Sequence, residues 1–171
     1  RVDRRHRQMC IRDRYYENRG LSYLSLGKCE SAISDYSVLI KIDPNKKEYY
    51  ESRGAAYLTL EQYDLAIADY SVLIKMDSEN KVYYENRGSA YMALEQYDLA
   101  IADYSVLIKM DSENKVYYEN RGSAYMALKK YDLAVADYFK AITLDSNCVQ
   151  AYNGRGSAYL ALKQYESAIT D

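Results

Sequence analysis

The chain has 171 residues, of which 49% are hydrophobic and 28% charged, and its formal net charge at pH 7 is −2. With one proline and 7 glycines it has the composition of a run of short helices, which argues against disorder and against an all-β fold. No stretch approaches the roughly 18 consecutive apolar residues of a transmembrane helix, so we expect no membrane-spanning segment.

The cysteines predict neither a disulfide framework nor a zinc site. Cys10, Cys29 and Cys148 are odd in number and widely separated, and none belongs to a C-x-x-C pair. A chain without disulfides suits a reducing compartment. This mildly favours the cytoplasm, although the sequence leaves the localisation undetermined.

The first 14 residues, RVDRRHRQMCIRDR, differ in composition from everything that follows. They hold six of the 23 basic residues and two of the 25 acidic ones, so the remainder carries 17 basic and 23 acidic residues. Met9 to Arg14 resembles a translated sequencing-adapter sequence, and such segments are excluded from fold reasoning. We expect residues 1–14 to be an adapter artefact or a disordered tail, with a basic arm for nucleic acid or a membrane surface as the third alternative.

From residue 15 onward the chain is organised by an internal repeat. Glu61–Leu94 is repeated, residue for residue, as Glu95–Leu128. The same period of 34 residues relates five glycines, namely Gly20, Gly54, Gly88, Gly122 and Gly156. A fixed period of this length indicates a solenoid, in which each unit buries its apolar face against its neighbours.

Each repeat is predicted to contain two helices separated by short turns. Within residues 81–94, Tyr84, Gly88 and Tyr91 recur at the spacing of one helix face. The second helix is expected to begin near Asp98. Four of its residues are expected on the face that packs against the first helix: Ala100, Tyr104, Leu107 and Ile108. Turn and N-cap residues follow at 43–45, 77–80, 111–114 and 145–147, which predicts the order helix, turn, helix, turn.

The regularly spaced glycines need a steric explanation, because a glycine inside a helix costs roughly 1 kcal/mol relative to alanine. We expect each glycine to face the alanine twelve residues later, as Gly88 would face Ala100, so that the two helices approach closely. Tyrosines four residues before and three residues after each glycine, such as Tyr84 and Tyr91, would fill the surrounding space. Most of the 22 tyrosines are therefore assigned to packing.

These positions resemble the tetratricopeptide repeat family, which has an aromatic residue, Gly and Tyr in the first helix and Ala and an aromatic in the second. The second repeat supplies them as Tyr50, Gly54, Tyr57, Ala66 and Tyr70. The resemblance covers residues 15–171 as repeats of about 13–46, 47–80, 81–114, 115–148 and a shortened 149–171. It implies an all-α solenoid of antiparallel helix pairs, stacked as a right-handed superhelix whose first helices line a concave groove.

The chain also departs from the family pattern. Only Pro44 keeps the proline of the turn, and an arginine occupies a position where many members have leucine. This arginine recurs in every repeat, and an aspartate follows it by sixteen residues, as Asp103 follows Arg87. We predict partly buried Arg–Asp pairs, either within repeats or between them.

Another face of the first helices is the expected binding surface. Its predicted residues recur at the repeat period and combine carboxylates, amides, hydroxyls and methionines: Glu51, Glu85, Asn86, Ser89, Met92, Glu119, Asn120, Ser123 and Met126. An acidic groove with an apolar floor suits a basic, amphipathic peptide of a partner protein. The alternatives are that the glutamates form a solvated face and that the repeats are a structural spacer or a self-association element.

Other functions are less consistent with the sequence. Glutamates such as Glu85 stand where a carboxylate clamp for chaperone C-terminal tails would need lysine, so binding of such acidic tails is not expected. His6 is the one histidine and there is no phosphate-binding loop, so we expect no enzymatic activity, cofactor or metal. The acidic repeat region argues against nucleic acid. Because Asp171 falls inside an expected helix, we expect a fragment of a longer scaffold, with self-association possible at the open C-terminal face.

Overall fold

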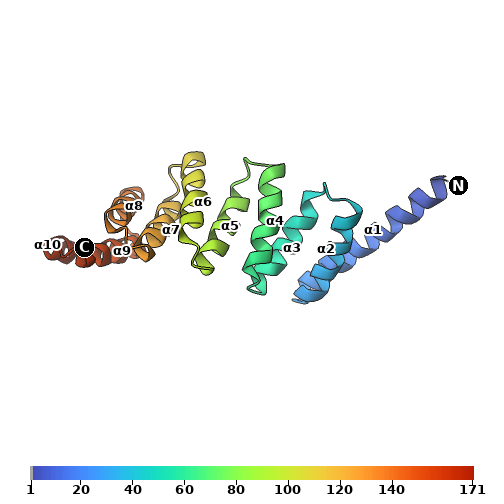
Figure 1. Ribbon diagram of the computed structural model, residues 1–171, viewed down its shortest axis with the longest axis horizontal. Coiled ribbons are helices and arrows are strands. Elements are labelled where there is room, and N and C mark those ends of the chain that lie inside the picture. The colour runs from blue at the N-terminus through green and yellow to red at the C-terminus, as the bar shows by residue number, and fades with distance from the viewer. Residues whose placement is uncertain (1) are drawn as a thin grey trace. The chain divides into compact units, whose positions relative to one another are not determined.

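The structure is a computed structural model that describes the backbone of residues 2–171 and the side chains of residues 12–171. Ten helices follow one another along this part of the chain, and the described residues contain no strand (Figure 1). The predicted all-α architecture is therefore confirmed. The expectations for residues 1–14 stay predictions, because the side chains of residues 1–11 lie outside the described part. The chain divides into two compact units, with the boundary between Ser78 and Glu79.

The first unit contains two helix pairs. Its helices are α1 (Val2–Ser25), α2 (Cys29–Ile42), α3 (Lys47–Thr59) and α4 (Tyr63–Met76). Each helix packs against the next one along the chain, so that α2 contacts both α1 and α3. This is the order that the repeat predicts.

The second unit contains three helix pairs. Its helices are α5 (Lys81–Ala93), α6 (Tyr97–Met110), α7 (Lys115–Ala127), α8 (Tyr131–Leu144), α9 (Val149–Ala161) and α10 (Tyr165–Thr170). Sequential helices again pack together, and α9 contacts α7 as well as α8. The predicted bounds of the first helix at 81–94 and of its partner from about Asp98 agree with α5 and α6 to within one residue.

The turn inside each pair contains a left-handed residue that the sequence analysis did not foresee. The backbone angle φ is 69° at Gly27, 56° at Glu61, 58° at Glu95, 59° at Lys129 and 60° at Lys163. In the second pair, the backbone N–H of Gln62 donates to the carbonyl of Tyr57 at 2.9 Å, and that of Glu61 donates to Leu58 at 3.0 Å. These two bonds form a Schellman motif, which usually requires glycine at the left-handed position. Only the first pair has that glycine.

The repeated glycine accommodates a tyrosine ring and not the predicted alanine. A Cβ atom built on Gly88 would lie 3.3 Å from Cζ of Tyr104, and one built on Gly54 would lie 3.3 Å from Cζ of Tyr70. The alanine expected at this contact, Ala100, is fully buried but is not among the nearest atoms. The glycine therefore makes room for the aromatic ring sixteen residues later, which is larger than a methyl group and reaches farther across the helix pair.

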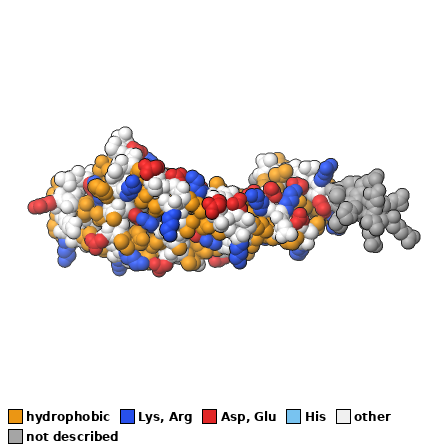
Figure 2. All heavy atoms as spheres, turned by 90° about the horizontal axis from the view of Figure 1, so that it is seen from above, with side chains coloured by type: hydrophobic (Ala, Val, Ile, Leu, Met, Phe, Trp, Pro, Cys, Tyr) orange, Lys and Arg blue, Asp and Glu red, His pale blue; other side chains and the backbone are white. Residues whose placement is uncertain are grey.

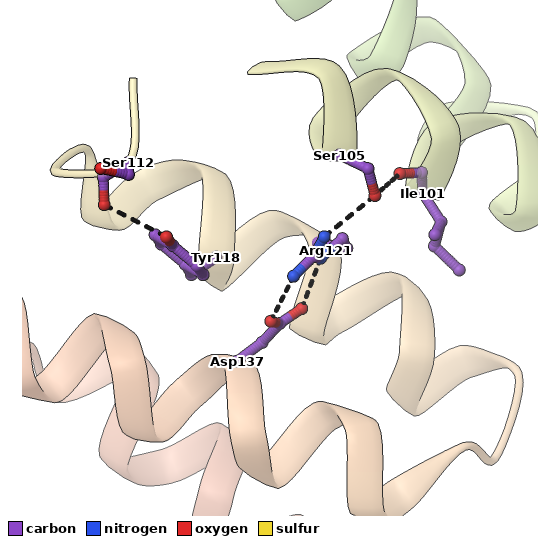
Figure 3. A network of polar contacts seen from close by, with 6 residues as sticks. All are labelled: Ile101, Ser105, Ser112, Tyr118, Arg121 and Asp137. Atoms are coloured by element: carbon purple, nitrogen blue, oxygen red, sulfur yellow. Dashed lines mark hydrogen bonds and ion pairs between the residues drawn. The ribbon is translucent and has the colours of Figure 1, made fainter. Parts of the chain in front are cut away.

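The predicted Arg–Asp pairs are confirmed, and they lie within repeats. In the fourth repeat, Nε of Arg121 donates to Oδ2 of Asp137 at 2.8 Å and Nη2 donates to Oδ1 at 2.7 Å. Asp137 is 5% exposed. Nη1 of the same guanidinium donates to Oγ of Ser105 on α6 at 2.9 Å, and Ser105 donates in turn to the carbonyl of Ile101 (Figure 3). The arginine thus joins its own helix pair and also connects it to the preceding pair.

The molecular surface mixes residue types. Figure 2 shows acidic and basic side chains interspersed among hydrophobic ones on the face that it presents. Among the residues searched, none of the helices is both long enough and apolar enough to cross a bilayer.

Candidate functional site

The second unit brings four of the nine predicted groove residues together in one hollow. Glu119, Asn120, Ser123 and Met126 project from α7 into a surface depression of about 440 Å³. The remaining lining residues come from α8 and α9: Tyr138, Gln150, Asn153, Gly154 and Ser157. Every residue that lines this hollow belongs to the fully described second unit, and none of them is lysine or arginine.

The other predicted residues do not line this hollow. Glu85, Asn86, Ser89 and Met92 occupy the same positions on α5 that the four lining residues occupy on α7, because the two repeats are identical in sequence. Glu85, Asn86 and Met92 are half-buried and Ser89 is exposed. Glu51 lies half-buried on α3 in the first unit.

Glu119 is the charged residue of the hollow, and it is unusually buried. Glu119 is 8% exposed, and the thiol of Cys148 donates a hydrogen bond to its Oε1 atom. Burial and, second, the hydrogen bond to Glu119 raise the pKa of Cys148 above its ordinary value, so the thiol keeps its proton.

The equivalent glutamates of other repeats receive different donors. The hydroxyl of Tyr117 donates to Oε1 of Glu85, and Nζ of Lys46 donates to Oε1 of Glu17 at 3.1 Å. Burial and the neighbouring Glu85 carboxylate raise the pKa of Tyr117 to about 12, so the phenol stays a donor. Glu85 thus accepts its hydrogen bond from the following repeat, and Glu17 accepts one from the last residue of its own repeat.

The fifth repeat explains why the hollow lies where it does. Its first helix has Ala151 in place of the tyrosine at Tyr117, and Gly154 in place of the asparagine at Asn120. With less bulk on α9, this helix lies against α7. A Cβ atom on Gly154 would lie only 2.4 Å from Cζ of Tyr138, so the ring of Tyr138 occupies the space that the glycine leaves.

Sequence reasoning missed the residues of the hollow that come from α8 and α9. It assigned most of the tyrosines to packing, which agrees with the 4% exposure of Tyr138, and it relied on the positions that all repeats share. Gln150, Asn153 and Gly154 are such departures, and comparing the two repeats position by position could have found them.

The residues that line the site offer hydrogen bonding and charge. In the described part of the chain, no group of three or more His, Cys, Asp or Glu side chains is arranged to bind a metal ion. The lining of the hollow consists of one carboxylate, side-chain amides, hydroxyls, a methionine, a glycine and a tyrosine.

Solved structures of similar fold cover most of the chain. A crystal structure of the MamA protein is 23% identical, covers 93% of this chain and 87% of its own, and has a TM-score of 0.86. The MamA fragment from residue 41 onward of Desulfovibrio magneticus RS-1 is 18% identical, with 93% and 90% coverage and a TM-score of 0.83. At these identities the likeness concerns the fold alone. A search of the curated proteins gave no match.

Family models account for almost the whole repeat region. A tetratricopeptide repeat model matches residues 116–148, and a model described as TPR repeat matches residues 20–61. A further tetratricopeptide repeat model matches residues 47–80, 82–114 and 149–171, which together exceed half of the chain. The chain belongs to the tetratricopeptide repeat family.

Proposed function

We propose that this protein is an interaction scaffold whose first helices bind a basic, amphipathic segment of a partner protein. Membership of the tetratricopeptide repeat family supports the general role, because these repeats are protein-interaction modules and not enzymes. The finer assignment, a peptide bound on the first helices, rests on the chemistry of the second unit.

The hollow between α7 and α9 is the observation that carries the proposal. It gathers Glu119, Asn120, Ser123 and Met126 into one depression, and its lining within the second unit contains no basic residue. Met126 supplies an adaptable apolar contact, while the carboxylate favours a positively charged ligand. The same residue types recur on α5 one repeat earlier, which suits an extended peptide with recurring basic residues.

The same chemistry disfavours other ligands. An acidic C-terminal tail of a chaperone would bring its carboxylate toward Glu119 and Glu85, which is repulsive. A nucleic acid would bring phosphates to the same surface, and phosphate binding requires lysine and arginine.

A charge reversal at Glu85 tests the proposed function. We expect the Glu85→Lys variant to bind basic, amphipathic peptides on a peptide array about tenfold more weakly than the unchanged chain, a loss of about 1.4 kcal/mol. The matched control is Glu113→Lys, which makes the same charge change at an exposed position in the turn before α7. Circular dichroism would show that both variants remain helical.

Two outcomes would argue against the groove. Equal loss in both variants would mean that net charge and not the α5 surface determines binding. If the unchanged chain bound no peptide at all, the repeats would be better described as a structural spacer.

Self-association is a second candidate function, and it rests on the last helix pair. Tyr165, Ile169 and Leu160 line a second hollow, of about 380 Å³, and Ile169 is 83% exposed. Within the second unit the corresponding face of α8 is covered by the first helix of the following repeat, α9. A second copy of the chain carries several such helices, so it has the chemistry to cover α10.

An acidic substitution at Ile169 tests self-association. We expect sedimentation velocity to show a concentration-dependent increase in mass for the unchanged chain and a monomer for Ile169→Glu, because a charge cannot be buried unpaired in an apolar contact. Leu133→Glu is the control, since Leu133 is exposed on α8, away from this hollow. A monomer at all concentrations for the unchanged chain would exclude this candidate.

A further inference from the structure

The two identical repeats do not present identical sites, because different residues cover them. On α5, Glu85 accepts a hydrogen bond from the phenol of Tyr117. For Glu119 on α7 the residue at the repeat position of Tyr117 is Ala151, which has no hydroxyl, and Glu119 accepts its hydrogen bond from the thiol of Cys148 instead. The sequence of the fifth repeat therefore distinguishes one of two otherwise equal glutamates.

The Glu119 carboxylate accepts its side-chain hydrogen bond from a thiol. A thiol is a weak hydrogen-bond donor compared with a phenol or an ammonium group. Glu119 is 8% exposed and lines the hollow, and its second oxygen, Oε2, is not among the fully buried atoms that lack a hydrogen-bond partner. The neighbouring cation, Lys115, pairs with Asp145. Because Glu119 is more buried than Glu85 and its donor is weaker, a cationic donor entering the hollow would gain more here than at Glu85.

The rest of the hollow suits a planar cation with several donors. The side-chain amides of Asn120, Gln150 and Asn153 and the hydroxyls of Ser123 and Ser157 belong to the lining of the same hollow, and both hydroxyls donate to backbone carbonyls of their own helices. The ring of Tyr138 also lines the hollow, and its hydroxyl lies 3.2 Å from Oγ of Ser123. A guanidinium group presents five N–H donors in one plane, whereas an ammonium group is a compact, strongly hydrated point charge.

We infer that the hollow between α7 and α9 is a pocket for an arginine side chain of the bound partner, with Glu119 as its charge partner. This inference rests on the proposed function and makes it more specific, because it assigns one residue type to one position of the ligand. The volume of about 440 Å³ lies within the roughly 300–1,000 Å³ of small-ligand pockets, which leaves room for a side chain and its water.

Nuclear magnetic resonance of the whole chain with single-residue probes tests the pocket. The probes are N-acetyl-arginine methylamide, its lysine analogue and its neutral citrulline analogue, which has nearly the shape of arginine. We expect the arginine probe to shift the amide signals of Ser123, Asn153 and Gly154 in a saturable way. The lysine probe should bind about tenfold more weakly, and citrulline should give no saturable shift.

The duplicated repeat supplies a matched control for the charge. Glu119→Gln keeps the shape and the oxygen that Cys148 contacts, and it should weaken arginine binding at least about tenfold, the effect of losing a hydrogen bond to a charged group. Glu85→Gln makes the same change on α5 and should leave these shifts unchanged. Equal effects of the two variants, or none for Glu119→Gln, would overturn the inference.

A second pair of variants avoids the buried position. Gln150→Lys places an ammonium group at the exposed rim of the hollow, where it should compete for Glu119 and abolish the arginine shifts. Val116→Lys makes the same addition at the equivalent exposed position of α7, and it should not. If Gln150→Lys left binding intact, arginine would not enter this pocket.

The outcomes separate the pocket from the groove. One outcome is that Glu85→Lys loses peptide binding while Glu119→Gln does not change the binding of the arginine probe. That outcome would support the proposed function and exclude the arginine pocket. Arginine binding at the hollow without any peptide binding would remove the proposed function and keep only a site for free guanidinium compounds.

Discussion

Replacing Asp137 by alanine is expected to lower the free energy of unfolding by about 3–5 kcal/mol, because it leaves a half-buried guanidinium without its charge partner. Asp137 accepts two hydrogen bonds from Arg121, and they raise the pKa of that guanidinium above its ordinary value. Urea denaturation followed by circular dichroism measures the loss.

Two comparisons show whether the cost comes from the unpaired charge. Removing both charges, as Arg121→Met with Asp137→Leu, should be less damaging than removing Asp137 alone, since no buried charge then remains. Asp35→Ala should also cost less, because its partner Arg19 has a side chain that is 36% exposed, compared with 19% for Arg121. A loss below about 1 kcal/mol for Asp137→Ala would place the pair with ordinary surface ion pairs.

Two alanine substitutions only two residues apart in α9 are expected to have opposite effects on stability. At Gly154 an added Cβ atom would lie 2.4 Å from the ring of Tyr138. This ring is 4% exposed, and it also packs against Gly122, where an added Cβ would lie 3.0 Å away, so it has little room to move. Overpacking typically costs about 1–3 kcal/mol. This cost outweighs the roughly 1 kcal/mol that alanine gains over glycine in a helix.

At Gly156 the nearest atom to the added Cβ would be Cβ of Asp171 at 3.8 Å, which is ordinary contact. Gly156→Ala should therefore stabilise the chain by up to about 1 kcal/mol. The midpoint of thermal unfolding should fall for Gly154→Ala and rise for Gly156→Ala. Combining Gly154→Ala with Tyr138→Leu should recover part of the loss. Stabilisation by both single substitutions would show that the ring of Tyr138 moves aside freely.

The helices and the ion pairs could be predicted because they depend on sequence period. Apolar spacing and the 34-residue repeat gave the bounds of α5 and α6. The constant separation of Arg87 and Asp103 was enough to pair them, although whether the pairs lie within or between repeats needed coordinates. Such features recur in every repeat, so each copy confirms the others.

What could not be predicted depends on individual contacts. The glycine was expected opposite an alanine, yet the reach of a tyrosine ring across the helix pair places Tyr104 there. Glu61 and Lys129 adopt a conformation that favours glycine, because the two Schellman hydrogen bonds and the helix that follows determine the chain direction at that point. The hollow beside Glu119 lies where the fifth repeat differs from the others, at Ala151 and Gly154, so the repeat period alone does not predict it.

The hydrogen bond between Arg121 and Ser105 has a consequence for cooperativity. In a repeat protein, unfolding spreads according to the strength of the coupling between neighbours. Arg121 provides such coupling, because one guanidinium belongs to the packing of two successive helix pairs. At the next interface Phe139 replaces the serine, and its ring lies 5.7 Å from the guanidinium carbon of Arg155. A cation–π contact thus takes the place of the hydrogen bond at the last interface, so the fifth helix pair is coupled to the fourth by a different kind of interaction from the one that couples the fourth to the third.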